Sequence, residues 1–452
     1  MSFSEPSQRR LLAVLFAGVL MSALDIAIVG PALPALQASF LVDSRALSWV
    51  FGIYVLFYLL SAPLMAKLSD RYGRRRIYVI DVSLFAIGSL VVVLSYSFEL
   101  LLMGRAVQAF GAGGILPVAS AVIGDTFPKE RRGRALGLIG AVFGLAFLLG
   151  PLLGGILLHW NWRLLFLINL PLAGLVIWQG GRLLPSAPET PNKPLDVEGI
   201  VLLSAMLAAF AWALSQLNVA EFGSSVRSMA VLPFFILPLV SLPWFFWVEK
   251  RAMDPLIHPE LLMSKQIRLI GVIAITAGIC EAGMVFLPAL LVLGLGVNEA
   301  TASFMLLPLV FALIIGAPIA GRLLDALGAK RVIQAGLSLT VVGMLFLSVS
   351  ELTYYSFYTA GVFLGLGLSA LLGAPLRYVL IEEASDTHRG AAQGLLTLCL
   401  CSGQLGGSAL VGGVAASRVT EYVGYQDAFF MVALVTGAVL LISKALRGNV
   451  PG

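Results

Sequence analysis

Fourteen long apolar runs, separated by short polar segments, organise this chain of 452 residues. Each run holds roughly 20 residues or more, which is the length at which an α-helix crosses about 30 Å of hydrocarbon. The pattern therefore predicts fourteen membrane-spanning helices, at 11–34, 47–67, 77–97, 100–125, 135–158, 163–184, 199–217, 229–248, 267–294, 301–322, 331–350, 355–381, 391–416 and 425–446.

Charge is scarce and lies mostly on one side of these spans. Hydrophobic residues make up 59% of the chain and charged residues 12%, so the bilayer must be the solvent for most of the surface. With the N-terminus in the cytosol, 24 of the 29 Lys and Arg residues lie in cytosolic segments, four lie outside, and Arg105 is within a span. This asymmetry predicts a multi-pass protein of the cell membrane with both termini cytosolic. The first run is longer than a signal-peptide core and contains Asp25, so no cleavable signal is expected.

Two similar polar loops divide the chain into repeated halves. The segment AKLSDRYGRRR runs over residues 66–76, and GRLLDALGAKR runs over residues 321–331. Their acids, Asp70 and Asp325, are 325 − 70 = 255 residues apart, and an apolar run begins near residue 266, which is 255 residues after Leu11. The chain therefore contains an internal repeat, as many transporters do.

The two loops resemble the loop motif of the major facilitator superfamily, G-x-L-x-D-R-x-G-R-K. Gly73 permits a tight bend, and a carboxylate at position 70 complements a helix N-terminus. The alternative is a plain positively charged loop that only sets topology. The resemblance implies a gating loop formed by Asp70, Arg71, Gly73, Arg74, Asp325 and, pairing with Arg74 from the end of the fourth span, Asp125.

A pair of helices in the middle separates the two halves. The segments 184–194 and 249–266 are connectors, and removing the two spans between them leaves six spans on each side. This plan resembles the fourteen-helix drug:proton antiporter family. The resemblance implies an all-α membrane protein with the major facilitator fold: an N-terminal six-helix bundle at 1–184, linkers with two extra transmembrane helices at 185–265, and a C-terminal six-helix bundle at 266–452.

The fifth predicted span is rich in glycine. Its sequence, GLAFLLGPLLGG at 144–155, resembles the antiporter motif G-x-x-x-G-P-x-x-G-G, which implies export rather than import. Glycines at these spacings let helices approach closely, although many membrane helices share that property. The residues concerned are Gly144, Gly150, Pro151, Gly154 and Gly155. The stretch GQLGG at 403–407 is their counterpart in the second half.

Three charged residues are expected inside the membrane. Asp25 and Glu281 each lie about 14 residues into equivalent spans, and Arg105 is calculated to lie at the depth of Asp25. A charge at mid-membrane costs about 2.5–3.5 kcal/mol on insertion scales, so such residues usually serve a cavity, a proton path or an ion pair. We expect Asp25, Glu281 and Arg105 to couple transport to protons, with a purely structural pairing as the alternative.

The remaining polar residues suggest no enzyme. Asp81, Glu382 and Glu383 are expected near the cytosolic face and solvated, and His159, His258 and His388 fall in loops. The three cysteines lie in apolar runs and indicate neither a disulfide framework nor a zinc site. No nucleotide-binding loop or nucleophile triad is present, so we expect no catalytic residue, cofactor, metal or nucleic acid partner.

The sequence favours a proton-driven exporter of amphiphilic or cationic small molecules that works by alternating access, as a monomer in the lipid bilayer. Export of an endogenous lipid or glycolipid is the alternative that shares the same fold. A membrane sensor without transport is a third reading, disfavoured because no large soluble domain is present. The substrate itself is not specified by these residues.

Overall fold

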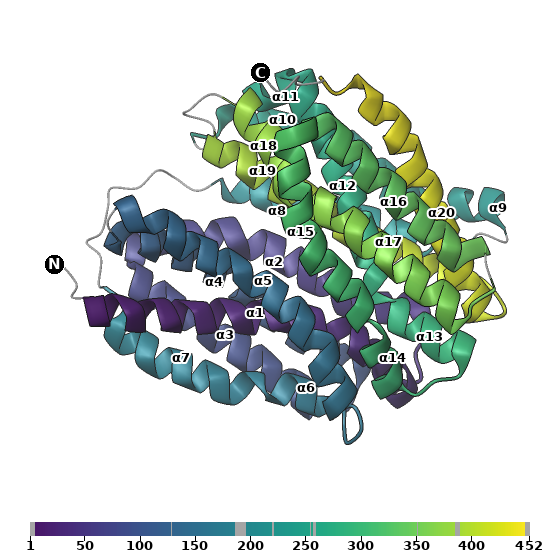
Figure 1. Cartoon of the computed structure of the whole chain (residues 1–452), viewed down its shortest axis with the longest axis horizontal. Helices are drawn as coiled ribbons and strands as arrows, with labels where there is room; N and C mark the ends of the chain where they lie inside the picture. Colours follow the sequence, from purple (N-terminus) through teal and green to yellow (C-terminus); the bar gives the residue numbers. More distant parts are fainter. Residues whose placement is uncertain are drawn as a thin grey trace. The chain divides into compact units, whose positions relative to one another are not determined.

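Helices make up all the regular structure in the described part of the computed structural model (Figure 1), which covers residues 5–127, 129–185, 196–218, 221–253, 255, 259–349, 351–384 and 389–447. The chain forms two compact units. The first contains Met1–Leu41 and Ile53–Val197, and the second contains Val42–Gly52 and Glu198–Gly452. The three-part division expected from the sequence, with boundaries after residues 184 and 265, remains a prediction.

The first unit is a bundle in which α3 packs against α4 and α7, and α1 packs against α5 and α7. In Figure 1 these helices are purple to blue, and α1, α3 and α7 run side by side. Its helices are α1 (Glu5–Phe40), α2 (Ser44–Tyr72, whose first nine residues belong to the second unit), α3 (Arg74–Leu94), α4 (Phe98–Thr126), α5 (Lys129–Leu157), α6 (Arg163–Leu167) and α7 (Asn169–Leu183).

The second unit is built mainly on three contacts: α12 with α19, α16 with α17, and α15 with α17. Its helices are α8 (Val197–Ser215), α9 (Phe222–Arg227), α10 (Leu232–Arg251), α11 (Pro259–Met263), α12 (Lys265–Val285), α13 (Leu287–Leu295), α14 (Glu299–Met305), α15 (Leu307–Leu327), α16 (Ala329–Val349), α17 (Tyr354–Leu372), α18 (Ala374–Glu383), α19 (Arg389–Ala415), α20 (Glu421–Ile442) and the 3-10 turn η1 (Ser443–Ala445).

Every predicted span corresponds to a helix or to a pair of consecutive helices. Among the described residues, thirteen helical segments are long and apolar enough to cross a membrane. The fourteenth expected span, 135–158, falls on α5, whose apolar stretch is assigned only over Val142–Leu157. The all-helical membrane fold is therefore confirmed, and the number fourteen remains a prediction.

Four expected spans are each divided into two helices, and a proline explains each division. The breaks fall at Ile168, Phe286, Leu306 and Gly373. In each case a proline follows within three residues, at Pro171, Pro288, Pro308 and Pro375. Proline has no N–H to donate and its ring collides with the carbonyl four residues earlier, so the hydrogen-bond ladder is interrupted at that point.

The internal repeat extends to the ends of the helices. Adding 255 to the limits of α2 gives 299 and 327, where α14 begins and α15 ends; adding 255 to α3 gives the limits of α16. The turn between these helices also recurs. Gly73 has φ 93° and ψ 138°, and Gly328 has φ 81° and ψ 158°. Only glycine adopts such angles without strain, which explains why both loops have it at this position.

Glycine also brings equivalent helix pairs together in the two units. A Cβ atom added to Gly150 of α5 would lie 2.7 Å from the Ala27 Cβ of α1. In the second unit, a Cβ added to Gly407 of α19 would lie 2.7 Å from the Ile279 Cα of α12. Both distances are too short for carbon atoms in contact. The glycine-rich segments of the fifth and thirteenth predicted spans therefore act as close-packing surfaces against α1 and α12.

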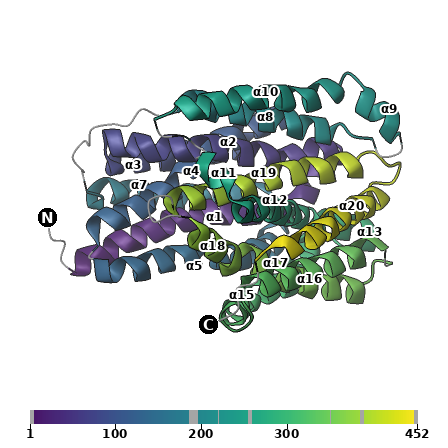
Figure 2. The ribbon, with the colours of Figure 1, turned by 90° about the horizontal axis from the view of Figure 1, so that it is seen from above.

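The two middle helices, α8 and α10, pack on each other (Figure 2). Ala213 and Leu217 at the end of α8 form a small core with Val231, and the Phe210 and Phe235 rings meet edge to face with centroids 5.7 Å apart. Most of the outer surface of α10 is apolar and exposed, as expected for a helix that faces lipid.

Replacement of Gly150 by Ala is expected to destabilise the protein, because the new methyl group would overlap Ala27. Overpacking of this kind costs about 1–3 kcal/mol, so the apparent melting temperature in detergent should fall by a few degrees. Gly144→Ala is the matched control, since no atom lies within 4 Å of a Cβ at that position. The measurement is thermal stability by size-exclusion chromatography, and equal stability of the two variants would refute the packing role of Gly150.

Candidate functional site

Asp25 is the centre of a buried polar cluster in the first unit. Its side chain has no solvent exposure, and neither has that of Arg105 on α4. The Arg105 Nη1 donates to Asp25 Oδ2 at 2.5 Å, so the ion pair that the sequence made possible is present. Two amides complete the set, because Gln108 Nε2 donates to Asp25 Oδ1 at 2.7 Å and Asn169 Nδ2 donates to the same oxygen at 3.1 Å.

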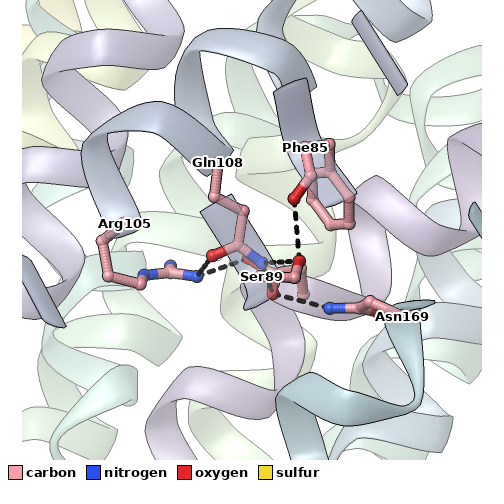
Figure 3. Close-up of polar contacts among 6 residues, drawn as sticks. Phe85, Ser89, Arg105, Gln108 and Asn169 are labelled. Carbon is pink, nitrogen blue, oxygen red and sulfur yellow. Dashed lines mark hydrogen bonds and ion pairs between the residues drawn. The ribbon is translucent and has the colours of Figure 1, made fainter. Parts of the chain in front are cut away.

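Helical spacing arranges the donors of this cluster. Arg105 and Gln108 are three residues apart on α4 and therefore share a face. Gln108 accepts from Arg105 Nη1 at 2.6 Å and donates to Ser89 Oγ at 2.8 Å, and Ser89 donates in turn to the carbonyl of Phe85 at 2.9 Å. Figure 3 shows Arg105 and Gln108 on one helix facing Ser89, with Asn169 approaching from another. Side chains of α4 and α7 thus meet the Asp25 carboxylate of α1 directly, and α3 joins the cluster through the Ser89–Gln108 hydrogen bond.

Aromatic rings enclose the guanidinium of Arg105. Its Cζ lies 4.2 Å from the centroid of the Tyr54 ring and 5.6 Å from that of Phe166. Such cation–π contacts contribute about 2 kcal/mol or more when the cation is removed from water. The rings belong to α2 and α6, so the pair is enclosed by two further elements of the first unit.

This geometry ties the charge of Asp25 to that of Arg105. Both carboxylate oxygens already accept hydrogen bonds, and an ionised carboxylate is an acceptor only. A proton arriving at Asp25 therefore removes the charge that balances Arg105. Leaving one member of a buried pair without its counter-charge costs about 3–5 kcal/mol, so protonation and rearrangement of Arg105 must occur together.

Glu281 of α12 has a different environment in the second unit. It is half-buried and accepts a hydrogen bond from Gln404 Nε2 of α19 at 2.9 Å. Within the described part of this unit, no Lys or Arg forms an ion pair with it. The two acids share a repeat position within one residue but differ in partners, since Asp25 has a cation and two amides whereas Glu281 has one amide.

The predicted gating loop of the first unit is assembled around Arg74. Arg74 pairs with Asp70, donates from Nε to Asp125 Oδ2 at 3.0 Å and donates from Nη1 to Ser69 Oγ at 2.7 Å. Its side chain is 15% exposed while that of Asp125 is 50% exposed. This single cation therefore ties together the ends of α2, α3 and α4. Arg71 lies beside it, exposed, with its guanidinium 5.2 Å from the Tyr72 ring centroid.

The loop of the second unit has the same turn but not the same ion pairs. Asp325 is exposed near the end of α15, and the position equivalent to Arg74 is Ala329. In the described residues around this turn, Asp325 makes no ion pair. The glycine-rich motif residues Gly150, Pro151, Gly154 and Gly155 are buried in α5, and Gly144 is half-buried.

Sequence reasoning missed several residues of the Asp25 cluster. Gln108 could have been found from its spacing to Arg105, but nothing in the pattern singled out Ser89 or Asn169. One expectation was wrong: Asp81 is not solvated but fully buried in α3, because it lies on the face of α3 that α4 covers. His159 Nδ1 donates to the Gly155 carbonyl at 2.8 Å, whereas His258, His388 and residues 186–194 of the linker lie outside the described residues.

Comparison with known proteins identifies the family. The family model of the Major Facilitator Superfamily matches residues 15–280 and 269–451, nearly the whole chain. The chain belongs to this superfamily. The protein is therefore a membrane transporter by family and not an enzyme.

Several relatives of this facilitator cover most of its length. It is 37% identical over 87% of the chain to the uncharacterized transporter YfiU of Bacillus subtilis, covering 77% of that protein. It is 30% identical over 88% of the chain to the multidrug resistance protein Stp of Mycobacterium tuberculosis, covering 74% of that protein. It is 28% identical over 79% of the chain to the riboflavin transporter RibZ of Clostridioides difficile, covering 78% of that protein. A solved bacterial homolog of the lysosomal transporter Spinster aligns over both whole chains with a TM-score of 0.72 at 16% identity, which shows the shared fold.

Removing one charge of the buried pair is expected to be worse than removing both. Arg105→Gln leaves Asp25 buried without a cation and should lose about 3–5 kcal/mol of stability, whereas Asp25→Asn combined with Arg105→Gln removes the imbalance. We expect the double variant of this facilitator to recover thermal stability but not transport. Thermal unfolding in detergent and transport in vesicles measure the two effects. A double variant less stable than Arg105→Gln would contradict this account.

Loss of Arg74 is expected to slow transport without preventing insertion. Ion pairs of this exposure contribute up to about 1 kcal/mol each, so we expect Arg74→Ala to reduce the transport rate by roughly two- to tenfold. Arg75→Ala is the matched control, because it removes the same charge from an exposed neighbour. Uptake into everted vesicles, normalised to the amount of inserted protein, is the measurement. Equal rates for both variants would reduce the loop to a topology signal.

Proposed function

We propose that this transporter is a proton-coupled exporter of amphiphilic or cationic small molecules that works by alternating access. The observation that carries the proposal is the fully buried Asp25–Arg105 pair with its amide partners Gln108 and Asn169. A carboxylate so placed can exchange its counter-charge for a proton or for a cationic substrate, and each exchange disturbs four helices at once.

The coupling step follows from competition at Asp25. A proton that reaches Asp25 releases Arg105, and a cationic substrate can balance the carboxylate in place of the guanidinium. Proton and substrate therefore exclude each other, which is the requirement for exchange of one for the other. Burial supports this role. A charged Asp25 is stable in this water-free site only while a cation balances it, whereas a neutral Asp25 needs no cation.

Glu281 is proposed as the second coupling carboxyl. Its single amide partner, Gln404, can hydrogen-bond to either the ionised or the protonated acid. No described arginine has to move when Glu281 changes its charge, so it can gain or lose a proton without breaking an ion pair. Asp25 would then couple substrate to conformation, while Glu281 gives transport its pH dependence.

The remaining parts of the proposal concern family and topology. We infer that the protein belongs to the fourteen-helix drug:proton antiporter family. Its two six-helix bundles would lie at 1–184 and 266–452, joined by the linkers and two extra helices at 185–265. We also infer that it is a monomer in the cell membrane with both termini in the cytosol. The relative named as a multidrug resistance protein supports the substrate class. The Arg74 cluster, with Asp70 and Asp125, would be a clasp that opens and closes at the cytosolic ends of its helices.

Other substrates lead to separate expectations. The relative named as a riboflavin transporter favours a flat heterocycle as the second candidate, and a lipid or glycolipid is the alternative that shares the same fold. Uptake of ethidium, riboflavin and a fluorescent phospholipid into everted vesicles distinguishes these classes. A membrane sensor without transport activity would take up none of the three.

Proton release on substrate binding tests the coupling residues. Ethidium added to the purified parent in weakly buffered detergent should release protons, because cation and proton compete for the carboxyls. We expect less release from Glu281→Gln, which should also lose the pH dependence of transport, and less from Asp25→Asn, which should lose efflux altogether. A pH indicator dye measures the release.

Glu99→Gln is the control variant, since it removes an exposed carboxylate at the start of α4. It should release as many protons as the parent. If Asp25→Asn and Glu281→Gln also released protons like the parent, the coupling carboxyls would lie elsewhere in the chain.

A further inference from the structure

A second buried carboxyl of the first unit is not used by the mechanism above. Asp81 of α3 has no solvent exposure, and both of its carboxylate oxygens are buried without a hydrogen-bond partner among the described residues. It shares the buried face of α3 with Tyr78, Phe85 and Ser89. Buried polar atoms in native proteins are nearly always paired, so two unpaired oxygens on one side chain require an explanation.

The helices around Asp81 provide space for it but no donor. The residue of α4 that faces its carboxyl is Gly114, where an added Cβ would overlap the carboxylate, and Gly111 faces the Asp81 backbone carbonyl. The Asp81 carboxyl therefore lies where a side chain at position 114 of α4 would otherwise be. Tyr78, on the same face of α3, has its hydroxyl directed at Gly18 of α1 and also lacks a partner.

The ionisable groups of the helices that pack on α3 are engaged elsewhere. The main neighbours of α3 are α4, α6 and α7, and the side chains of all three are described. Each titratable side chain of these helices has another partner. Arg105 pairs with Asp25, and Asp125 pairs with Arg74. Arg163 donates to the carbonyls of Val93 and Ser95, Arg182 lies over the Trp178 ring, and Glu99 is exposed to solvent.

The second unit shows that the packing does not require an acid. The residue 255 positions after Asp81 is Gly336 of α16, and a Cβ there would lie 2.9 Å from the Ala370 Cβ of α17. The equivalent interface therefore closes tightly with glycine. An ionised carboxylate without a partner is far more costly in such a place than a neutral acid, so the site as built suits the protonated form.

We propose that Asp81 is a second proton-binding site of the first unit, occupied by a proton while α3 and α4 are packed at Gly114 and emptied into water when that contact opens. The proposal rests on the proton coupling proposed above and adds a site to it. The step is balanced: the O–H bond of the carboxylic acid breaks, the proton passes to water, and a carboxylate remains on Asp81.

The position of Asp81 connects it to both clusters already described. It lies seven residues, or about 10 Å, from Arg74 at the start of α3, and eight residues, or about 12 Å, from Ser89. The Arg74–Asp125 pair joins the ends of the same two helices whose contact covers Asp81. Release of that pair would let α4 move away from α3 and admit water, so the clasp would control when Asp81 can lose its proton.

Infrared spectroscopy tests the proton directly, without a transport assay. In the purified parent at neutral pH, a C=O stretching band of a protonated carboxylic acid should be present that Asp81→Asn lacks and Asp25→Asn retains. Asp81→Asn keeps the size of the side chain. If that variant does not fold, Asp81→Gly, which copies Gly336 of the second unit, is measured instead. A band unchanged in the Asp81 variant would overturn the proposal.

Transport measurements then separate a coupling site from a fixed structural acid. Asp81→Asn should bind ethidium as the parent does but release fewer protons and lose part of the pH dependence of export. Loss of the band with unchanged proton release and pH dependence would overturn the coupling role. Absence of substrate-induced proton release from the parent itself would instead refute the proposed antiport, while the infrared result would still decide whether Asp81 holds a proton.

Discussion

The first unit depends on one constraint: a charge placed inside a membrane helix needs a counter-charge and a complete set of hydrogen bonds. The Asp25–Arg105 pair meets this requirement with donors from α4 and α7 and with the Tyr54 and Phe166 rings around the guanidinium. Because the partners come from different helices, the pair is also a constraint on how those helices pack. Neutralisation of Asp25 would therefore remove contacts that hold α1 to α4 and α7.

Small residues make this arrangement possible. Gly88 of α3 lies so close to the backbone of α4 at Gln108 that any side chain would collide, and Gly150 does the same between α5 and α1. Close backbone approach holds the polar side chains within hydrogen-bonding distance, since helix pairs separated by large side chains would leave Gln108 and Ser89 too far apart. The glycine-rich segments and the buried charges are therefore parts of one design.

The sequence predicted the helices well because their signal is simple. Length and apolarity located the spans, and the 255-residue repeat related the polar loop and the first span of one half to those of the other. Depth arithmetic along two helices showed that Asp25 and Arg105 could pair, and the pair is present. It could not reveal Asn169 or Ser89, because their contacts depend on the rotation of α7 and α3 about their axes. Asp81 was misplaced for the same reason: distance from a basic loop says nothing about which face of a helix is covered.

The proline breaks give the two halves different mechanical character. Among the described helices, three of the four divided spans, at Phe286, Leu306 and Gly373, belong to the second unit and only one, at Ile168, belongs to the first. Each break leaves carbonyls without their usual helical donors, and such points open at lower free energy than an intact ladder. The second unit therefore holds more of the points at which a span can open locally. Amide hydrogen exchange in the divided spans should begin at Phe286, Leu306 and Gly373 before it reaches the helices that Asp25 joins through Arg105 and Asn169.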